Sequence, residues 1–137
     1  MKKYYLLLIL AFTIFNSCES VPYSYRNSPV ENSDNFEELM KIDEVDRKIR
    51  AAEAVNLFLN EVPEDKNAAV LIENNSTCNM VVRIVGAKNY QLPVPKMGKN
   101  YVVLPKGMYQ FQAKVCNSSY NATKILMESI SIALSGN

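Results

Sequence analysis

The sequence of 137 residues contains no histidine, no tryptophan and no Cys-x-x-Cys pair, and it has only four glycines. Without histidine, ordinary zinc sites are excluded, and without Cys-x-x-Cys so is thioredoxin-like redox chemistry. The four glycines are isolated from one another, so neither of the phosphate-cradling glycine motifs is present. We therefore expect no metal, no cofactor, no nucleotide site and no nucleic-acid partner.

Acidic side chains are scarce in the second half of the chain. Residues 67–137 carry seven Lys and Arg but only two carboxylates, Glu73 and Glu128. A hydrolase needs a positioned acid and base, so we expect no enzyme unless these two approach each other in a cleft. Residues 18–66 carry twelve Asp and Glu against six Lys and Arg. We interpret this acidic part as a solvated tether and helix, with a functional basic face on residues 67–137 as the alternative.

Long apolar runs are also missing, apart from one run of twelve residues between Tyr4 and Phe15. A membrane-spanning helix needs about twenty such residues, so a run this short, after Lys2 and Lys3, is typical of a secretory signal. Ser17 stands directly before Cys18, as in bacterial lipoproteins whose cysteine thiol receives a diacylglycerol. The sequence predicts a signal peptide over 1–17 and lipidation of Cys18. Plain secretion and an uncleaved anchor are the alternatives.

The number of cysteines supports the same interpretation. Three cysteines in an exported protein leave one unpaired unless something consumes it, and lipidation of Cys18 would do so. Cys78 and Cys116 can then form a disulfide in an oxidising compartment, where such bonds persist. Two buried reduced thiols are the alternative. We expect a protein of the cell envelope, held by lipid at the outer membrane on its periplasmic or surface face.

Two segments precede the second half of the chain. Residues 18–34 are rich in Ser, Asn, Pro and Tyr without apolar periodicity, which predicts a flexible tether. Residues 35–62 predict one amphipathic helix, with Asp34 as its cap and Pro63 beyond its end. An apolar stripe along this helix must pack on the chain's own β-domain or on a partner helix, and Asn56 and Ala52 weaken a coiled-coil seam. Its members are Leu39, Ile42, Val45, Ile49, Ala52, Val55 and Leu59.

From residue 67 the pattern changes to short runs of alternating apolar and polar residues, separated by Asn, Gly and Pro. The clearest strand is Tyr109 to Val115, in which Gln110, Gln112 and Lys114 take the solvent side, and it should end or bulge before Cys116. The segment Gly98 to Asn100 is typical of a turn. We predict a mainly β domain over 67–137, a small antiparallel β-sandwich or barrel-like sheet of six to seven short strands.

Tyrosines and lysines are the remaining candidates for a binding site. Aromatic rings and cations together could bind a sugar or a phosphate, and core packing is the alternative explanation for each tyrosine. We place Tyr109 in the core because it alternates with solvent residues. The candidate binding face consists of Tyr90, Tyr101, Lys99 and Lys106.

Residues 68–134 resemble a domain-of-unknown-function family found in small Bacteroidota lipoproteins. The residues that carry the likeness are Glu73-Asn74-Asn75-Ser76-x-Cys78-Asn79, Val82-Arg83-Ile84, Tyr90-x-Leu92-Pro93-Val94-Pro95, Gly98-Lys99-Asn100, Lys106-Gly107-x-Tyr109, Val115-Cys116, Tyr120 and Lys124. The resemblance implies an exported, usually lipid-anchored β-domain and brings no known activity or ligand.

Together these patterns favour a non-enzymatic, lipid-anchored envelope protein whose β-domain binds another protein or an envelope glycan. The alternative is a lipoprotein inhibitor of a secreted hydrolase such as a lysozyme or protease, because a rigid β-domain can present a loop to a foreign active site. An exposed loop carrying Tyr or Lys would favour the inhibitor, and a concave aromatic face would favour glycan binding.

Overall fold

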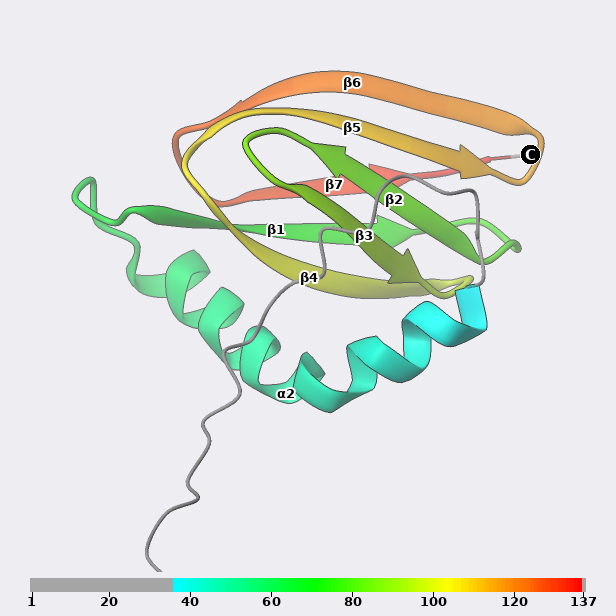
Figure 1. Cartoon of the computed structure of the whole chain (residues 1–137), viewed down its shortest axis with the longest axis horizontal. Helices are drawn as coiled ribbons and strands as arrows, with labels where there is room; N and C mark the ends of the chain where they lie inside the picture. Colours follow the sequence, from blue (N-terminus) through cyan, green and yellow to red (C-terminus); the bar gives the residue numbers. More distant parts are fainter. Residues whose placement is uncertain (1–35, 137) are drawn as a thin grey trace, which may run out of the picture.

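The computed structural model describes residues 36–136, as one helix packed against a two-layered β-sandwich (Figure 1). The predicted signal peptide, Cys18 and the tether over 18–34 lie outside the described residues. Among residues 36–136 there is no helix with the length and apolar character needed to span a membrane. The elements are α2 (Phe36–Asn60), β1 (Asn67–Asn74), β2 (Met80–Val85), β3 (Asn89–Val94), β4 (Gly98–Pro105), β5 (Gly107–Val115), β6 (Ser118–Leu126) and β7 (Ile130–Leu134).

The strands form two sheets with strand orders β4-β1-β7 and β3-β2-β5-β6. This confirms the small mainly β sandwich predicted from the alternating pattern. All pairs are antiparallel except β1 and β7, which run parallel, with Val70 opposite Ile130. The chain reaches β7 by crossing from one sheet to the other after β6, so β7 arrives at β1 in the same direction.

Alternation of side chains explains the core. Residues of β2 and β5 that point toward the other sheet are buried at every second position, and their neighbours are at least partly exposed. Strand β3 follows the same pattern except at Pro93, which is buried as well. Apolar side chains from both sheets meet in one cluster, in which Phe111 is the largest fully buried side chain. Other members are Val70, Ile72, Met80, Val82, Ile84, Tyr90, Leu92, Val94, Val102, Leu104, Tyr109, Val115, Leu126, Ile132 and Leu134.

The turn between β4 and β5 carries the chain from one sheet to the other. Tyr109 reaches back across this turn, and its hydroxyl donates a hydrogen bond to the carbonyl oxygen of Pro105 at 2.9 Å. Burial raises the pKa of Tyr109, so the hydroxyl keeps the proton that it donates. The backbone N–H of Lys106 donates to the carbonyl oxygen of Lys66 at 2.9 Å, which ties the turn to the beginning of β1.

Helix α2 lies along the open side of the sandwich, where it contacts β4, β1 and β3 (Figure 1). Its sheet-facing side holds Asp43 and Ala54, both buried, with half-buried Leu39 and Leu57 nearby. The helix therefore packs on the chain's own β-domain, as one of the two predicted arrangements has it.

The face that makes this contact differs from the predicted one. The apolar stripe through Ile42, Val45 and Ile49 is exposed to solvent rather than packed on the sheets. The physical reason is that the polar contacts of Asp43 and Glu61 fix the orientation of the helix. They turn another apolar side, with Leu39, Ala54 and Leu57, toward the sheets. The expectation that this stripe is buried by the β-domain was wrong.

At its first half the helix is held by a buried carboxylate. Asp43 accepts hydrogen bonds from Arg50 of its own helix and from the side-chain amide of Asn100 in β4, the latter at 2.8 Å. The same amide of Asn100 donates to the carbonyl oxygen of Pro93 in β3 at 2.8 Å. One amide thus links the helix to the edge strands of both sheets.

Just beyond the helix, Glu61 makes the second set of contacts. It forms an ion pair with Lys106 at 3.0 Å and accepts a hydrogen bond from the backbone N–H of Ser129 at 2.7 Å. Desolvation alone would raise the pKa of Glu61, but the hydrogen bonds from Ser129 and Lys106 outweigh it and hold the pKa below its ordinary value of 4.5. The acidic helical part and the basic β-domain therefore meet in at least this ion pair.

Two local predictions need correction. The segment Gly98 to Asn100 is the first part of β4 and not a turn, because the side chain of Asn100 is buried and bonded as described. Strand β6 runs from Ser118 to Leu126, although most of these residues lack the alternating apolar pattern on which the predicted strands rest. Cys116 does follow the end of β5, where its φ is 53°, as the break in alternation predicts.

Candidate binding face

The outer face of the four-stranded sheet is the most distinctive polar surface of the described residues. It is formed by the side chains of β3, β2, β5 and β6 that point away from the core. In the register of the sheet, Gln91, Arg83, Gln112 and Asn121 stand side by side on four adjacent strands. We call this set of three amides and one guanidinium the amide row.

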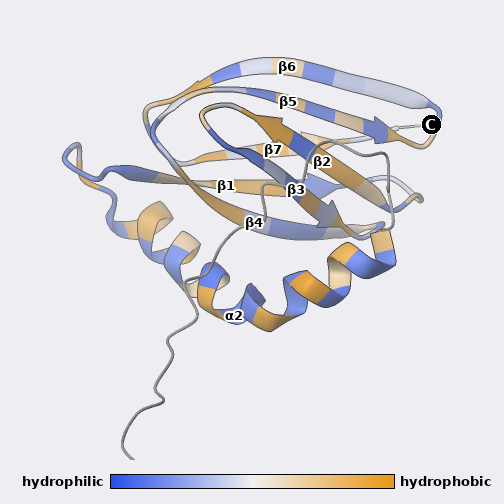
Figure 2. Ribbon diagram, viewed as in Figure 1, coloured by the Kyte–Doolittle hydropathy of each residue, from blue (hydrophilic) through white to orange (hydrophobic). Residues whose placement is uncertain are grey.

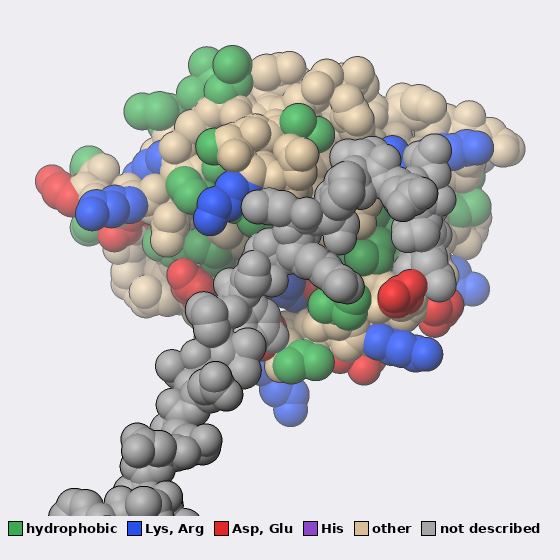
Figure 3. All heavy atoms as spheres, viewed as in Figure 1, with side chains coloured by type: hydrophobic (Ala, Val, Ile, Leu, Met, Phe, Trp, Pro, Cys, Tyr) green, Lys and Arg blue, Asp and Glu red, His purple; other side chains and the backbone are tan. Residues whose placement is uncertain are grey.

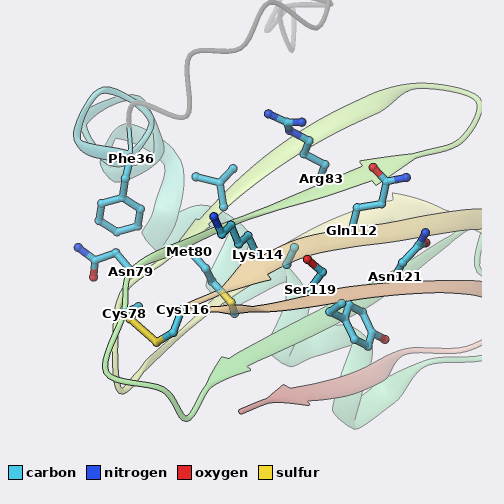
Figure 4. Close-up of a pocket in the computed structure, with 13 residues that line it drawn as sticks. Phe36, Cys78, Asn79, Met80, Arg83, Gln112, Lys114, Cys116, Ser119 and Asn121 are labelled. Carbon is cyan, nitrogen blue, oxygen red and sulfur yellow. A yellow bond between two sulfur atoms is a disulfide. The ribbon is translucent and has the colours of Figure 1, made fainter. Parts of the chain in front are cut away.

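Neighbouring positions extend the amide row in both directions along the strands. Gln110 lies opposite Thr123 on one side, and its side-chain amide donates to Asn121 at 3.1 Å. Lys114 lies opposite Ser119 on the other side. Figure 4 shows Arg83, Gln112 and Asn121 rising on the same side of the sheet. No Asp or Glu among the described residues belongs to this face.

The surface is hollowed around these side chains. Among the described residues, the hollow is lined by Arg83, Gln112, Lys114 and Asn121, and Phe36 at the beginning of α2 contributes to one of its sides (Figure 4). The disulfide lies at the end of the sheet where Phe36 borders the hollow (Figure 4). The hollow therefore combines amides, two cations and the aromatic rings of Phe36 and Tyr120, and its described lining contains no carboxylate.

A disulfide joins Cys78 to Cys116, with 5.4 Å between their Cα atoms. Cys78 lies in the loop before β2 and Cys116 in the turn after β5, so the bond links two connections at one end of the four-stranded sheet. This confirms the predicted pairing. A loop of this length restricts the unfolded chain enough to contribute about 4 kcal/mol to stability in the chain-entropy model.

The loop that carries Cys78 is organised by a buried amide. Asn74 donates from its side chain to the carbonyl oxygens of Cys78 at 2.8 Å and Val94 at 3.2 Å. Its side-chain oxygen accepts hydrogen bonds from both the backbone N–H and the hydroxyl of Ser76, at 3.0 and 2.7 Å. Both amide atoms are thus satisfied, and the loop is fixed where it borders the hollow.

The four residues predicted as a binding face are not brought together. Tyr90 is buried in the core between the sheets, where its ring cannot act as a platform for a ligand. Lys106 is paired with Glu61 beyond the helix. Lys99 and Tyr101 do share the outer face of β4, and the Lys99 carbonyl accepts a hydrogen bond from Arg47 at 3.0 Å.

The two carboxylates of the β-domain are also far apart. Glu73 lies near the end of β1, paired with Ala133, whereas Glu128 precedes β7 by two residues and lies near the beginning of β1. Glu73 and Glu128 are therefore separated along β1 by four or more extended residues, which corresponds to roughly 13 Å or more. Residues 36–136 contain no cluster of three or more Cys, Asp or Glu side chains that could hold a metal ion.

The sequence pattern predicted only part of the outer face of the four-stranded sheet. Alternation placed Gln110, Gln112 and Lys114 on one solvent face, and the structure agrees. It could not add Ser119 and Asn121, because most of β6 has too few apolar residues to be identified as a strand. The signal was present only in the length of the segment between Cys116 and Ile125, which is close to the length of β5.

Comparison with known proteins identifies a family but no activity. The DUF6759 family, a domain of unknown function, matches residues 44–137. No curated protein of similar sequence matches the chain. Among solved structures, the crystal structure of a DUF3823 family protein from Parabacteroides merdae ATCC 43184 is similar, with 13% sequence identity and a TM-score of 0.39. The similarity covers 53% of this chain and 46% of that one, so this chain spans less than half of its length. A similarity at this level carries no functional information.

Proposed function

Since the chain belongs to the DUF6759 family, whose function is unknown, we propose that it is a non-enzymatic, lipid-anchored protein of the cell envelope. We further propose that the outer face of the sheet β3-β2-β5-β6 binds an acidic envelope glycan. The observation that carries the glycan proposal is the amide row, with Lys114 beside it and no carboxylate among the described residues of the same face.

The chemistry of the face matches that of an acidic sugar. A side-chain amide both donates and accepts hydrogen bonds, as a sugar hydroxyl does, so a row of amides can follow a row of hydroxyls. Arg83 and Lys114 supply the positive charge that a sugar carboxylate prefers. The described residues of the face include no carboxylate that would repel such a ligand.

The position of the tyrosines argues against a neutral sugar as the preferred ligand. Neutral sugars are often held by stacking on aromatic rings. Tyr109 and Tyr90 point into the core, and Tyr120 packs against it from β6. Phe36 and Tyr120 are the aromatic residues among the described lining of the hollow, and the ring of Tyr120 is partly taken up by the core. Hydrogen bonds and charge therefore have to supply most of the recognition.

Binding to polysaccharides tests this proposal. The purified full chain is titrated with polygalacturonate and with uncharged dextran, and we expect it to bind the acidic polymer in preference. In the double variant Arg83→Gln, Lys114→Gln, the dissociation constant should rise by about tenfold or more, because each charge-assisted hydrogen bond contributes roughly 1.5–3 kcal/mol.

The matched control removes two positive charges elsewhere. Lys66→Gln combined with Lys99→Gln changes the net charge equally but leaves the amide row intact, so it should bind polygalacturonate as the unmodified chain does. Equal weakening by both double variants would mean nonspecific charge attraction and would overturn the site. No binding to either polymer would favour a protein ligand instead.

The lipid anchor rests on the sequence before residue 36. The short apolar run, Ser17 before Cys18, and the disulfide that leaves Cys18 as the odd cysteine all support it. Mass spectrometry of the protein from its host should find an N-terminal Cys18 carrying acyl chains, and Cys18→Ala should release the protein from membranes. Recovery of an intact Met1 with a free Cys18 thiol would contradict the anchor.

The inhibitor alternative gains no specific support. Such an inhibitor would need a loop that projects from the sandwich, whereas the strand connections among the described residues are short. Lys106 alone separates β4 from β5, and two residues separate β5 from β6. The widely separated Glu73 and Glu128 likewise lend no support to catalysis, so we keep the non-enzymatic proposal.

A further inference from the structure

Helix α2 presents a second apolar face that the sandwich leaves uncovered. Ile42, Val45, Ile49 and Leu59 expose 64%, 74%, 71% and 75% of their surface, respectively. Side chains as large as these are normally buried when they recur along one helix. Figure 2 shows hydrophobic bands repeating along α2 from end to end. The helix is thus apolar on one side and held to the sheets by another.

The two sides are nearly opposite each other. Successive helical residues turn by about 100°, so Val45 points roughly 160° away from Asp43, the residue buried against β4. The same relation holds for Ala52 and the buried Ala54. A partner on the exposed side would therefore meet the helix without contacting the sandwich.

The spacing on this side is that of a heptad repeat. Ile42, Val45, Ile49, Ala52, Asn56 and Leu59 follow one another at intervals of three, four, three, four and three residues. They take the a and d positions in alternation, with Ile42 and Ile49 at a. Ile at a is preferred in two-stranded parallel coiled coils. A single Asn at a, here Asn56, lowers stability but fixes register and favours two strands, so the residue that weakens the seam also specifies it.

The flanking charges identify the partner. The g positions before Ile42 and Ile49 hold Lys41 and Lys48, and the e positions after Val45 and Ala52 hold Asp46 and Glu53. In a parallel pair each g residue faces the e residue five positions later in the other helix. Lys41 then faces Asp46 of a second copy, and Lys48 faces Glu53.

The opposite orientation would be unfavourable. In an antiparallel pair of identical helices, g faces g and e faces e, which would set lysine against lysine and acid against acid. Charge complementarity thus selects an identical helix in parallel orientation. We propose that α2 forms a parallel two-stranded coiled coil with α2 of a second copy of this chain, so that the protein is a homodimer.

The existing fold lowers the cost of this dimer. The stripe from Ile42 to Leu59 spans fewer than three heptads, a length that is marginal for isolated helices because ordering them costs free energy. Here α2 is already ordered by Asp43, Ala54 and Glu61 against the sheets. Association then has to overcome only the loss of free rotation and translation and the fixing of side chains.

Sedimentation equilibrium on the purified full chain tests the proposal. We expect a dimer, and Ile49→Glu should raise its dissociation constant by about 100-fold or more, because two buried isoleucines per dimer are lost to charges. Ile49 is exposed in the single chain, so the substitution should leave circular dichroism and thermal unfolding of the monomer unchanged. The control Met127→Glu alters an equally exposed apolar side chain outside the helix and should remain dimeric.

Two charge-reversal variants test the partner and its pairing. Lys41→Glu with Lys48→Glu, and Asp46→Lys with Glu53→Lys, should each be monomeric alone, because every g–e pair becomes repulsive. Mixed together they should form a heterodimer in which all these pairs are attractive. Self-association of either variant as strong as that of the unmodified chain would overturn the proposed pairing.

A cysteine placed at a d position tests the orientation. In a chain with Cys18→Ser, Val45→Cys should form an interchain disulfide on mild oxidation, since Val45 faces its own copy only when the helices are parallel. Glu44→Cys, which points away from the seam, should not. A monomer at the highest soluble concentration, or cross-linking by Glu44→Cys alone, would contradict the coiled coil.

Discussion

At the scale of single residues, two buried asparagines connect separate parts of the fold by hydrogen bonds. Asn74 and Asn100 are fully buried, and each uses its amide nitrogen for two acceptors. Buried polar groups are costly unless they are satisfied, so both positions require the amide and not just a polar side chain of similar size. In the sequence, each asparagine looked like an ordinary turn residue.

Replacing Asn74 by Asp should destabilise the domain by about 2–3 kcal/mol. The carboxylate would direct an oxygen at the carbonyl oxygens of Cys78 and Val94, where the amide now donates. Urea unfolding followed by circular dichroism measures the change. The neighbouring Asn75→Asp, at an exposed position, is the control and should shift the free energy of unfolding by less than about 0.5 kcal/mol.

Glu61 should make part of the stability dependent on pH. Its folded pKa is lowered by the hydrogen bonds from Ser129 and Lys106, so its contribution is present above the ordinary value of 4.5 and is lost as the pH falls through the folded pKa. At neutral pH, Glu61→Gln should lower the free energy of unfolding by up to about 1 kcal/mol.

The difference between Glu61→Gln and the unmodified chain should shrink in acid, because a protonated Glu61 resembles glutamine. Thermal unfolding at a series of pH values from neutral to acid measures this convergence. Glu64→Gln, at an exposed position, serves as the control and should change stability little at neutral pH. A gap that stays constant over the whole range would show that the charge of Glu61 is not involved.

At the scale of elements, the sequence predicted those strands whose residues alternate regularly between the core and the surface. Strand β5 alternates strictly between core and surface, so its bounds and inner face were predictable. Strand β6 lies at the edge of its sheet and buries only Leu126 fully, so Ser118 to Thr123 carry almost no apolar signal. Edge strands pair on one side alone and tolerate polar residues, which hides them from pattern analysis.

For helix α2, the element itself was predicted correctly and the side that packs on the sheets was not. Its existence and its bounds were predictable to within two residues, but the pattern identified the wrong contact face. Apolar periodicity reports which side avoids water and does not report what covers it. Asp43 and Arg50 take the helix's inner side because they complete a hydrogen-bond network with Asn100, and no count of apolar residues contains that information.

The turn from β4 to β5 depends on one hydroxyl. Tyr109→Phe removes the hydrogen bond to Pro105 and leaves a carbonyl oxygen without its partner, so we expect a loss of about 1–2 kcal/mol in the free energy of unfolding. Chemical unfolding measures it. The control Tyr120→Phe changes a tyrosine that packs on the core without a hydroxyl hydrogen bond to the described residues, and it should cost clearly less.

At the scale of the whole molecule, the disulfide should contribute a large part of the stability. Reducing Cys78–Cys116 frees a loop of 38 residues in the unfolded state, and we expect the free energy of unfolding to fall by about 4 kcal/mol. Guanidinium unfolding with and without a thiol reductant measures the change. In the double variant Cys78→Ser, Cys116→Ser the reductant should have no effect, and that variant should resemble the reduced protein.

The candidate binding face also belongs to this scale, because no single element carries it. Alternation assigned the side chains of β5 correctly, yet the amide row exists only once β2 and β6 pair with β5, and β3 pairs with β2, in register. The neighbours of β5 come from segments up to about 30 residues away in sequence. Strand order follows from how both sheets close over one core, which a local pattern does not encode.

The parallel pairing of β1 with β7 has a consequence for the order of events during biosynthesis. The first strand of the sandwich receives its second neighbour only when Ile130–Leu134 are in place, so one edge of β1 stays open while residues 75–129 leave the ribosome. Contacts between such distant segments form slowly. The sandwich therefore closes only after its last strand has been synthesised, and until then the chain lacks the partner that completes its three-stranded sheet.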